Sequence, residues 1–151
     1  MDERVALATT PEALADAGRL LHAFNTAYDD PSPGPDALAS RLAELVGRGD
    51  TDVLVAPGAG VAVIRYRPSL WSPADEAYLA ELWVDPSARR QGLGRALLLG
   101  CLERARGRGC DLLDLSTSED DVEARALYES AGLHATEGPG GPTAYHYEIE
   151  L

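Results

Sequence analysis

The stretch from residue 82 to residue 95 constrains the fold of this chain more than any other. It reads Leu-Trp-Val-Asp-Pro-Ser-Ala-Arg-Arg-Gln-Gly-Leu-Gly-Arg, an apolar strand that breaks at a proline and runs into an apolar helical pattern. Pro86 cannot donate to a sheet ladder, so it ends the strand. Gly92 and Gly94 let backbone N–H groups approach a bound group without a Cβ in the way. The following helix points its free N–H groups and positive dipole end at the same loop, which predicts an anion site.

Two other phosphate-binding loops are excluded by the residues present. A dinucleotide-binding loop requires three glycines spaced G-x-G-x-x-G near the first strand, and a P-loop ends in Gly-Lys-Ser or Gly-Lys-Thr. Neither pattern occurs, and the chain contains no lysine. The alternative that stays open is a glycine-rich turn that only starts a helix.

The charge distribution points to the same loop. The net charge is −12, which disfavours nucleic acid and anionic membranes as partners. Residues 89–108 nevertheless hold six arginines against a single acid, Glu103. A multiply phosphorylated cofactor bound at the loop would explain this basic island inside an acidic protein. For Arg104, Arg106 and Arg108, a solvated helix face is the favoured explanation of the charge.

Length and cysteine content indicate the general class. A chain of 151 residues can bury one core, so we expect a single domain over residues 1–151. No apolar run reaches membrane-spanning length, and the start lacks the charged-then-apolar order of a secretion signal. Cys101 and Cys110 are the only cysteines and make no disulfide framework. We therefore expect a cytoplasmic protein, either a monomer or a homodimer.

Hydrophobic periodicity predicts an alternation of strands and helices. Helices are predicted at residues 11–27, 36–46 and 92–106, and a fourth opens with a capping box at Ser118. Strands are predicted at residues 5–8, 51–56, 61–67, 77–84, 111–116, 133–136 and 144–151. The strand at 111–116 should run parallel to the one at 77–84, because a helix crosses between them.

Two motifs resemble those of the GNAT family of N-acetyltransferases. Arg89-x-x-Gly92-x-Gly94 after Asp85-Pro86 is similar to the family's acetyl-CoA loop. The run Asp121-x-x-Ala124-x-x-Leu127-Tyr128-x-x-x-Gly132-Leu133 is similar to its Asn-x-x-Ala-x-x-x-Tyr helix and following Gly-Phe pair, with Asp for Asn and Leu for Phe. The resemblance covers essentially the whole chain. It implies an α/β (α+β) GNAT fold, whose mixed twisted sheet has about six to seven strands, about four helices and a splay between strands 4 and 5.

The resemblance implies acetyl-CoA as co-substrate and no metal. Backbone groups of Leu82 and Val84 would hold the pantetheine arm as an added strand would, and N–H groups of the loop would hold the pyrophosphate. The cofactor-binding residues implied in this way are Leu82, Trp83, Val84, Arg89, Arg90, Gln91, Gly92, Leu93, Gly94, Arg95, Asp121 and Tyr128.

Two residues are candidates for proton transfer. Tyr128 lies where the family places the acid that protonates the leaving thiolate. Its alternative role is that of a core aromatic at helical spacing. Glu81 interrupts an apolar strand, where a carboxylate is hard to justify by packing alone, and is the candidate base for the amine. Pairing of Glu81 with an arginine or a backbone N–H is the structural alternative.

The acceptor site of the family is bounded by the first two helices, their loop and the final strands. The corresponding residues here are Phe24, Asn25, Tyr28, Asp29, Trp71, Tyr145 and His146. Aromatic rings with acids suit a small molecule with a cationic amine, although a protein N-terminus is an alternative acceptor. A different class also stays open, a non-catalytic acetyl-CoA sensor or partner subunit. His22, His134 and His146 lie on separate predicted elements without metal-ligand spacing.

Overall fold

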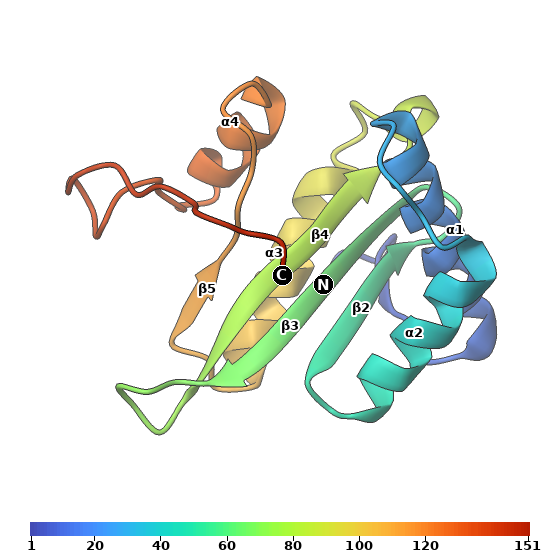
Figure 1. The fold of residues 1–151 in the computed structure, drawn as a ribbon, viewed down its shortest axis with the longest axis horizontal. Helices are drawn as coiled ribbons and strands as arrows, with labels where there is room; N and C mark the ends of the chain where they lie inside the picture. Colours follow the sequence, from blue (N-terminus) through green and yellow to red (C-terminus); the bar gives the residue numbers. More distant parts are fainter. The chain divides into compact units, whose positions relative to one another are not determined.

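A five-stranded sheet with the order β1-β2-β3-β4-β5 organises the first part of the chain (Figure 1). The computed structural model describes residues 1–151, and internal contacts divide them into two units, Met1–Leu115 and Ser116–Leu151. The elements of the first unit are β1 (Ala6–Leu7), α1 (Pro11–Ala27), α2 (Pro35–Gly47), β2 (Thr51–Ala56), β3 (Gly60–Pro68), β4 (Asp75–Val84), a 3-10 turn (Pro86–Ala88), α3 (Leu93–Gly107) and β5 (Leu112–Asp114). The second unit contains α4 (Val122–Ser130). That residues 1–151 form one domain stays a prediction.

The pairing of the strands follows from the connections between them. Strands β1 to β4 are antiparallel neighbours, and a short turn at residues 57–59 joins β2 to β3. Strand β5 runs parallel to β4 because α3 crosses between them, which confirms the predicted direction. Only Glu76, Ala77 and Tyr78 of β4 pair with β5.

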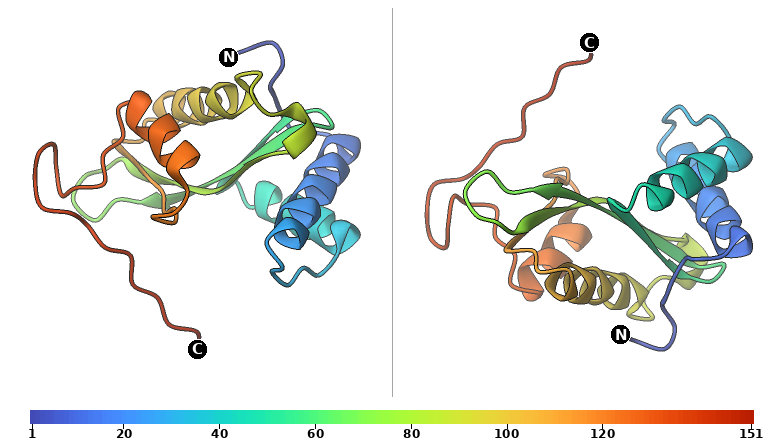
Figure 2. Two further views of the ribbon diagram at one scale, coloured as in Figure 1. Left: turned by 90° about the horizontal axis from the view of Figure 1, so that it is seen from above. Right: turned by 90° about the horizontal axis from the view of Figure 1, so that it is seen from below.

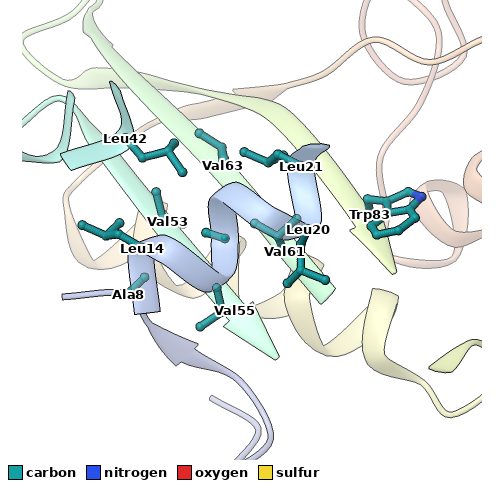
Figure 3. Close-up of a cluster of buried hydrophobic side chains, with 11 residues drawn as sticks. Ala8, Leu14, Leu20, Leu21, Leu42, Val53, Val55, Val61, Val63 and Trp83 are labelled. Atoms are coloured by element: carbon teal, nitrogen blue, oxygen red, sulfur yellow. The ribbon is translucent and has the colours of Figure 1, made fainter. Parts of the chain in front are cut away.

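Helices cover both faces of the sheet. Helices α1 and α2 lie on one face and α3 lies on the other (Figure 2). The α1 face carries a buried cluster of Ala8, Leu14, Ala17, Leu20, Leu21, Leu42, Val53, Val55, Val61, Val63 and Trp83 (Figure 3). Leu54 and Ile64 alternate with these valines along β2 and β3, so their side chains face α3. Helix α3 contributes Leu97, Leu98 and Cys101 to the core on this side of the sheet. These two residues of the sheet and the three residues of α3 are all fully buried.

Gly18 allows α1 and α2 to cross closely. A Cβ at this position would lie 2.5 Å from the backbone oxygen of Pro35 and 2.9 Å from the backbone nitrogen of Ala39. Both are backbone atoms, so the helices themselves would have to separate. The glycine therefore sets the distance between the two helices.

We expect Gly18→Ala to lower the free energy of unfolding by about 1–3 kcal/mol, because it overpacks this crossing. Gly47→Ala is the matched control, since nothing lies within 4 Å of the added methyl group at the end of α2. Urea denaturation of both variants measures the difference. Equal stability of the two variants would mean that the helices can move apart at little cost.

Two predicted strands in the second unit are wrong. Residues 133–136 and 144–151 form no strand, and one isolated bridge joins Thr136 to Thr143. The alternation at the C-terminus specifies a face but not a hydrogen-bonded partner, and a strand requires both. The apolar members of that alternation are exposed, namely Tyr145, Tyr147, Ile149 and Leu151. The sheet consequently has five strands in place of about six to seven, while the four α-helices agree with the prediction.

The start of α4 also differs from the prediction. The N-cap is Asp121, whose side chain accepts a hydrogen bond from the backbone nitrogen of Ala124 at 3.1 Å. Ser118, predicted to open a capping box, accepts instead from the backbone nitrogen of Asp120 at 3.3 Å. Aspartate is itself a preferred N-cap residue, so the helix begins three residues later than expected.

Candidate cofactor and acceptor site

The C-terminal half of β4 has an open edge. The backbone nitrogen of Asp85 donates to the oxygen of Ala59 at 2.8 Å, toward β3. Backbone groups alternate in direction along a strand, so those of Val84 and Leu82 point to the opposite edge. Residues 79–84 have no strand partner there, because β5 ends opposite Tyr78. This edge is a row of backbone donors and acceptors that an extended ligand can pair with.

A β-bulge decides which side chains of β4 face α1. The register between β3 and β4 steps from Val63↔Glu81 to Ile64↔Leu79, which leaves Ala80 as the extra residue. One extra residue reverses the alternation of every side chain beyond it. Glu81 therefore lies on the α1 face, with its cross-strand neighbour Val63 and with Trp83.

The loop between β4 and α3 has the backbone features of an anion site. The Asp85 carboxylate accepts from the backbone nitrogen of Ser87 at 3.0 Å and from its hydroxyl at 2.6 Å, and these bonds lower the pKa of Asp85. Arg90 and Gly92 are left-handed, with φ of 63° and 76°. Left-handed residues in a tight loop are typical of backbone concavities that bind anions. The N-terminal N–H groups of α3 begin directly after them.

Two arginine side chains contact this loop region. Arg89 folds back so that its Nε donates to the carbonyl oxygen of Val84 at 3.0 Å, on the open edge of β4. Arg4 donates to the carbonyl oxygen of Gln91 at 2.7 Å. Asp2 holds the Arg4 guanidinium by two hydrogen bonds of 3.0 and 2.7 Å, and Arg4 lowers the pKa of Asp2 to about 2. Sequence reasoning missed Arg4, which lies 87 positions before its partner and belongs to no motif.

Three aromatic side chains meet on the α1 face. The ring of Phe24 stacks on that of Trp83 with a centroid distance of 5.8 Å and an interplanar angle of 8°. Tyr28 meets Phe24 edge-on at 5.5 Å and 74°. Trp83 is 5% exposed, while Tyr28 is 57% exposed. The structure thus brings together two of the predicted acceptor residues, Phe24 and Tyr28, with a residue predicted for the cofactor.

The other predicted acceptor residues of the first unit are Asn25, Asp29 and Trp71. Asn25 donates its side-chain N–H to the oxygen of Pro31 at 2.7 Å and so fixes the loop after α1, where Asp29 is left-handed with φ of 55°. Trp71 is 89% exposed on the turn that precedes β4. This turn and Trp83 lie at opposite ends of β4, roughly 30 Å apart along the strand. Trp71 is therefore separated from Phe24 and Tyr28.

The remaining predicted residues belong to the second unit. There, Nδ1 of His146 lies 3.3 Å from the hydroxyl of Ser116, and its Nε2 lies 3.4 Å from the carboxylate of Glu148. Tyr145 is 76% exposed and Tyr128 is half-buried on α4. Asp121, predicted to contact the cofactor, caps α4.

Glu81 is accessible to solvent, yet desolvation by the surrounding protein raises the pKa of its carboxyl group. No ion pair or hydrogen bond holds the carboxyl, which removes the structural alternative of pairing with an arginine. A carboxyl group with a raised pKa binds a proton more readily than an ordinary glutamate. It is suited to accept a proton from an amine.

The cysteines do not offer a nucleophile. Cys101 is fully buried, and this burial raises the pKa of its thiol to about 12. Desolvation also raises the pKa of Cys110. No group of three or more His, Cys, Asp or Glu side chains could hold a metal ion, and no helix is long and apolar enough to cross a membrane.

Comparison with known proteins gives a match over most of the chain. The profile of the acetyltransferase (GNAT) family matches residues 21–133. A crystal structure of an acetyltransferase-family protein from Arthrobacter sp. FB24 is 39% identical, covers 97% of this chain and 95% of its own, and has a TM-score of 0.86.

Two curated relatives match a shorter stretch. The ribosomal protein bS18-alanine N-acetyltransferase of Escherichia coli K12 is 45% identical over 60 residues, which is 40% of each chain. The mycothiol acetyltransferase of Beutenbergia cavernae is 40% identical over 68 residues, which is 43% of this chain and 23% of that protein. The match therefore spans less than half the length of these two relatives.

Proposed function

The chain belongs to the acetyltransferase (GNAT) family, and we propose that it transfers an acetyl group from acetyl-CoA to the primary amine of a small molecule. The observation that carries this proposal is the open edge of β4 running directly into the anion loop before α3. An extended arm that ends in a pyrophosphate matches both parts at once. The amine is cationic before reaction, which suits the aromatic and acidic side chains of the α1 face.

Acetyl-CoA, the family's co-substrate, fits the edge and the loop in order. The amides of its pantetheine arm would pair with backbone groups of Leu82 and Val84, and loop N–H groups from Arg89 to Arg95 would hold the pyrophosphate. Arg89 would have to release the Val84 carbonyl when the arm binds. Its guanidinium would then be free to pair with a phosphate.

The chemistry requires a neutral amine and a protonated leaving thiolate. Glu81 would take the proton from the ammonium group, directly or through one water molecule, since its own pKa is raised by desolvation. The amine would then attack the thioester carbon while a backbone N–H of β4 polarises the carbonyl. Holding both substrates in one site replaces a bimolecular encounter with a local attack.

Tyr128 is the proposed acid that protonates the thiolate of coenzyme A. This role rests on the similarity of the α4 motif to that of the family. We expect Tyr128→Phe to lower kcat about tenfold with an unchanged Kd for acetyl-CoA, because a single hydrogen bond to the departing sulfur is lost. Tyr147→Phe is the control, since that ring is 88% exposed. A wild-type kcat in Tyr128→Phe would assign the tyrosine a structural role.

Release of free thiol from acetyl-CoA across a panel of amines tests the proposed activity. The panel should contain alkylamines, amino acids, polyamines, aminoglycosides and peptides with a free N-terminus. Peptides are the second candidate class, because the Escherichia coli relative is an N-acetyltransferase for the alanine of a ribosomal protein. Binding of acetyl-CoA without thiol release for any amine would favour a sensor or a partner subunit. Absence of binding would reject the assignment of the loop.

Arg4 is expected to support cofactor binding by holding the loop through the carbonyl of Gln91. We expect Arg4→Ala to raise the Kd for acetyl-CoA about three- to tenfold, since a charge-assisted hydrogen bond is lost. Arg41→Ala removes the same charge from the exposed face of α2 and should leave Kd unchanged. Calorimetric titration of both variants measures the difference. Equal Kd values would show that the loop holds its shape without Arg4.

A further inference from the structure

The structure contains two buried side-chain nitrogen atoms without a hydrogen-bond partner, Nε1 of Trp83 and Nε of Arg65. Buried polar groups are nearly always paired, so an orphan donor requires an explanation. Trp83 is 5% exposed, and its nitrogen points away from the aliphatic side chains of the α1 face (Figure 3). The ring itself is held by the stack on Phe24.

Both donors lie on the face of the sheet that carries Glu81. Trp83 follows Glu81 by two residues on β4, about 7 Å along the strand. Arg65 lies two residues from Val63, which is the cross-strand neighbour of Glu81, and pairs with Tyr78 on the other side of the bulge. Alternation along β3 places Arg65 and Val63 on the same face. The unpartnered donors thus flank the proposed base.

The guanidinium of Arg65 also forms no ion pair. The Arg65 side chain takes part in no ion pair or hydrogen bond, although the protein carries a net charge of −12. The neighbouring Arg67 has a carboxylate partner in Glu76, and Arg104 has one in Asp52. Because the Arg65 guanidinium has no carboxylate partner within the protein, it is available to bind an oxygen atom of a ligand.

We infer that the acceptor carries, in addition to its amine, a carboxylate or carbonyl oxygen that accepts the indole N–H of Trp83. This inference rests on the proposed transfer to an amine bound at Glu81. Trp83 is then a specificity-determining residue, and Arg65 favours an acceptor with a carboxylate. The chemical class is an amino acid, an amino carboxylate or an amide of one, in preference to a simple alkylamine. A site that holds a hydrogen-bond donor for the substrate discriminates against an analogue without the acceptor oxygen.

Matched acceptors test the inference without a variant. Rates of thiol release should be compared for amino carboxylates of two to six carbons, their amides and n-alkylamines of the same length. For at least one length we expect kcat/KM of an oxygen-bearing acceptor to exceed that of the alkylamine about tenfold. Acetylation of alkylamines with no such preference at any length would overturn the inference and leave the proposed function intact. Failure of every amine would overturn the proposed function itself.

The variant Trp83→Phe tests whether Trp83 determines this preference. We expect this variant to reduce the preference for the oxygen-bearing acceptor about three- to tenfold, through a higher KM. Both acceptors are measured on one preparation, so the ratio does not depend on how much of the variant is folded. Tyr66→Phe is the control, because it removes the hydroxyl group of another buried aromatic residue. That hydroxyl donates to Asp52 at 2.8 Å on the opposite face of the sheet. An unchanged preference in Trp83→Phe would contradict the assigned role.

Discussion

Gly94→Leu should weaken the binding of acetyl-CoA about a hundredfold or more while leaving the protein folded. Gly94 is the second residue of α3, where leucine is a better helix former than glycine. Cα–Cβ bonds of a helix tilt toward its N-terminus, so the leucine side chain would cover the N–H groups that face the anion loop. The loss of two or more charge-assisted hydrogen bonds, each about 1.5–3 kcal/mol, accounts for the size of the effect.

Gly107→Leu is the matched control at the other end of the same helix, where nothing lies within 4 Å of an added Cβ. Gly92 is a less suitable position for this test, because its φ of 76° would strain any larger residue and distort the loop. The Kd is obtained by calorimetry and the fold is checked by urea denaturation. A Kd for Gly94→Leu close to that of the wild type would refute the location of the pyrophosphate.

Glu81→Gln should lower kcat/KM about a hundredfold or more at neutral pH, the range expected for loss of a general base. In the wild type, kcat/KM should rise with pH through the raised pKa of Glu81, because only the carboxylate accepts a proton. The variant should lack this limb of the profile. Glu76→Gln, on the same strand and paired with Arg67, should retain the limb and most of the rate.

Although Glu81→Gln should be less active, its free energy of unfolding at neutral pH should not fall. The pKa of Glu81 is higher in the folded state than its ordinary value of 4.5, so folding favours the protonated form. The stabilising contribution of this group is complete below pH 4.5 and is lost as the pH rises through the folded-state pKa. At pH 7 the variant should therefore be at least as stable as the wild type. A less stable variant with a normal rate would assign Glu81 a structural role.

Elements with strong local signals could be predicted from the sequence. Helix α1 begins where expected, because Thr10 accepts from the backbone nitrogen of Ala13 at 3.2 Å and Pro11 occupies the first position. Helix α3 and the direction of β5 follow from the glycines and from the crossover. The predicted strand at residues 144–151 is wrong because an alternation of side chains does not supply a strand to pair with.

The site depends on contacts that no local pattern encodes. The bulge at Ala80 determines that Glu81 and Trp83 face α1, and nothing in the run from residue 77 to residue 84 marks it. Arg4 reaches the loop from the other end of the chain. The sequence identified the residue types at the site, but the register of two strands determined which of them meet.

The position of Arg89 also bears on the behaviour of the protein before any cofactor binds. An uncovered strand edge is a template on which a second copy of the chain could add a strand, the first step of aggregation. The Arg89 guanidinium donates a hydrogen bond to the Val84 carbonyl and places a positive charge at the end of that edge. This one side chain would therefore hinder strand addition by another polypeptide while the site is empty, and it would become available to a phosphate when acetyl-CoA binds.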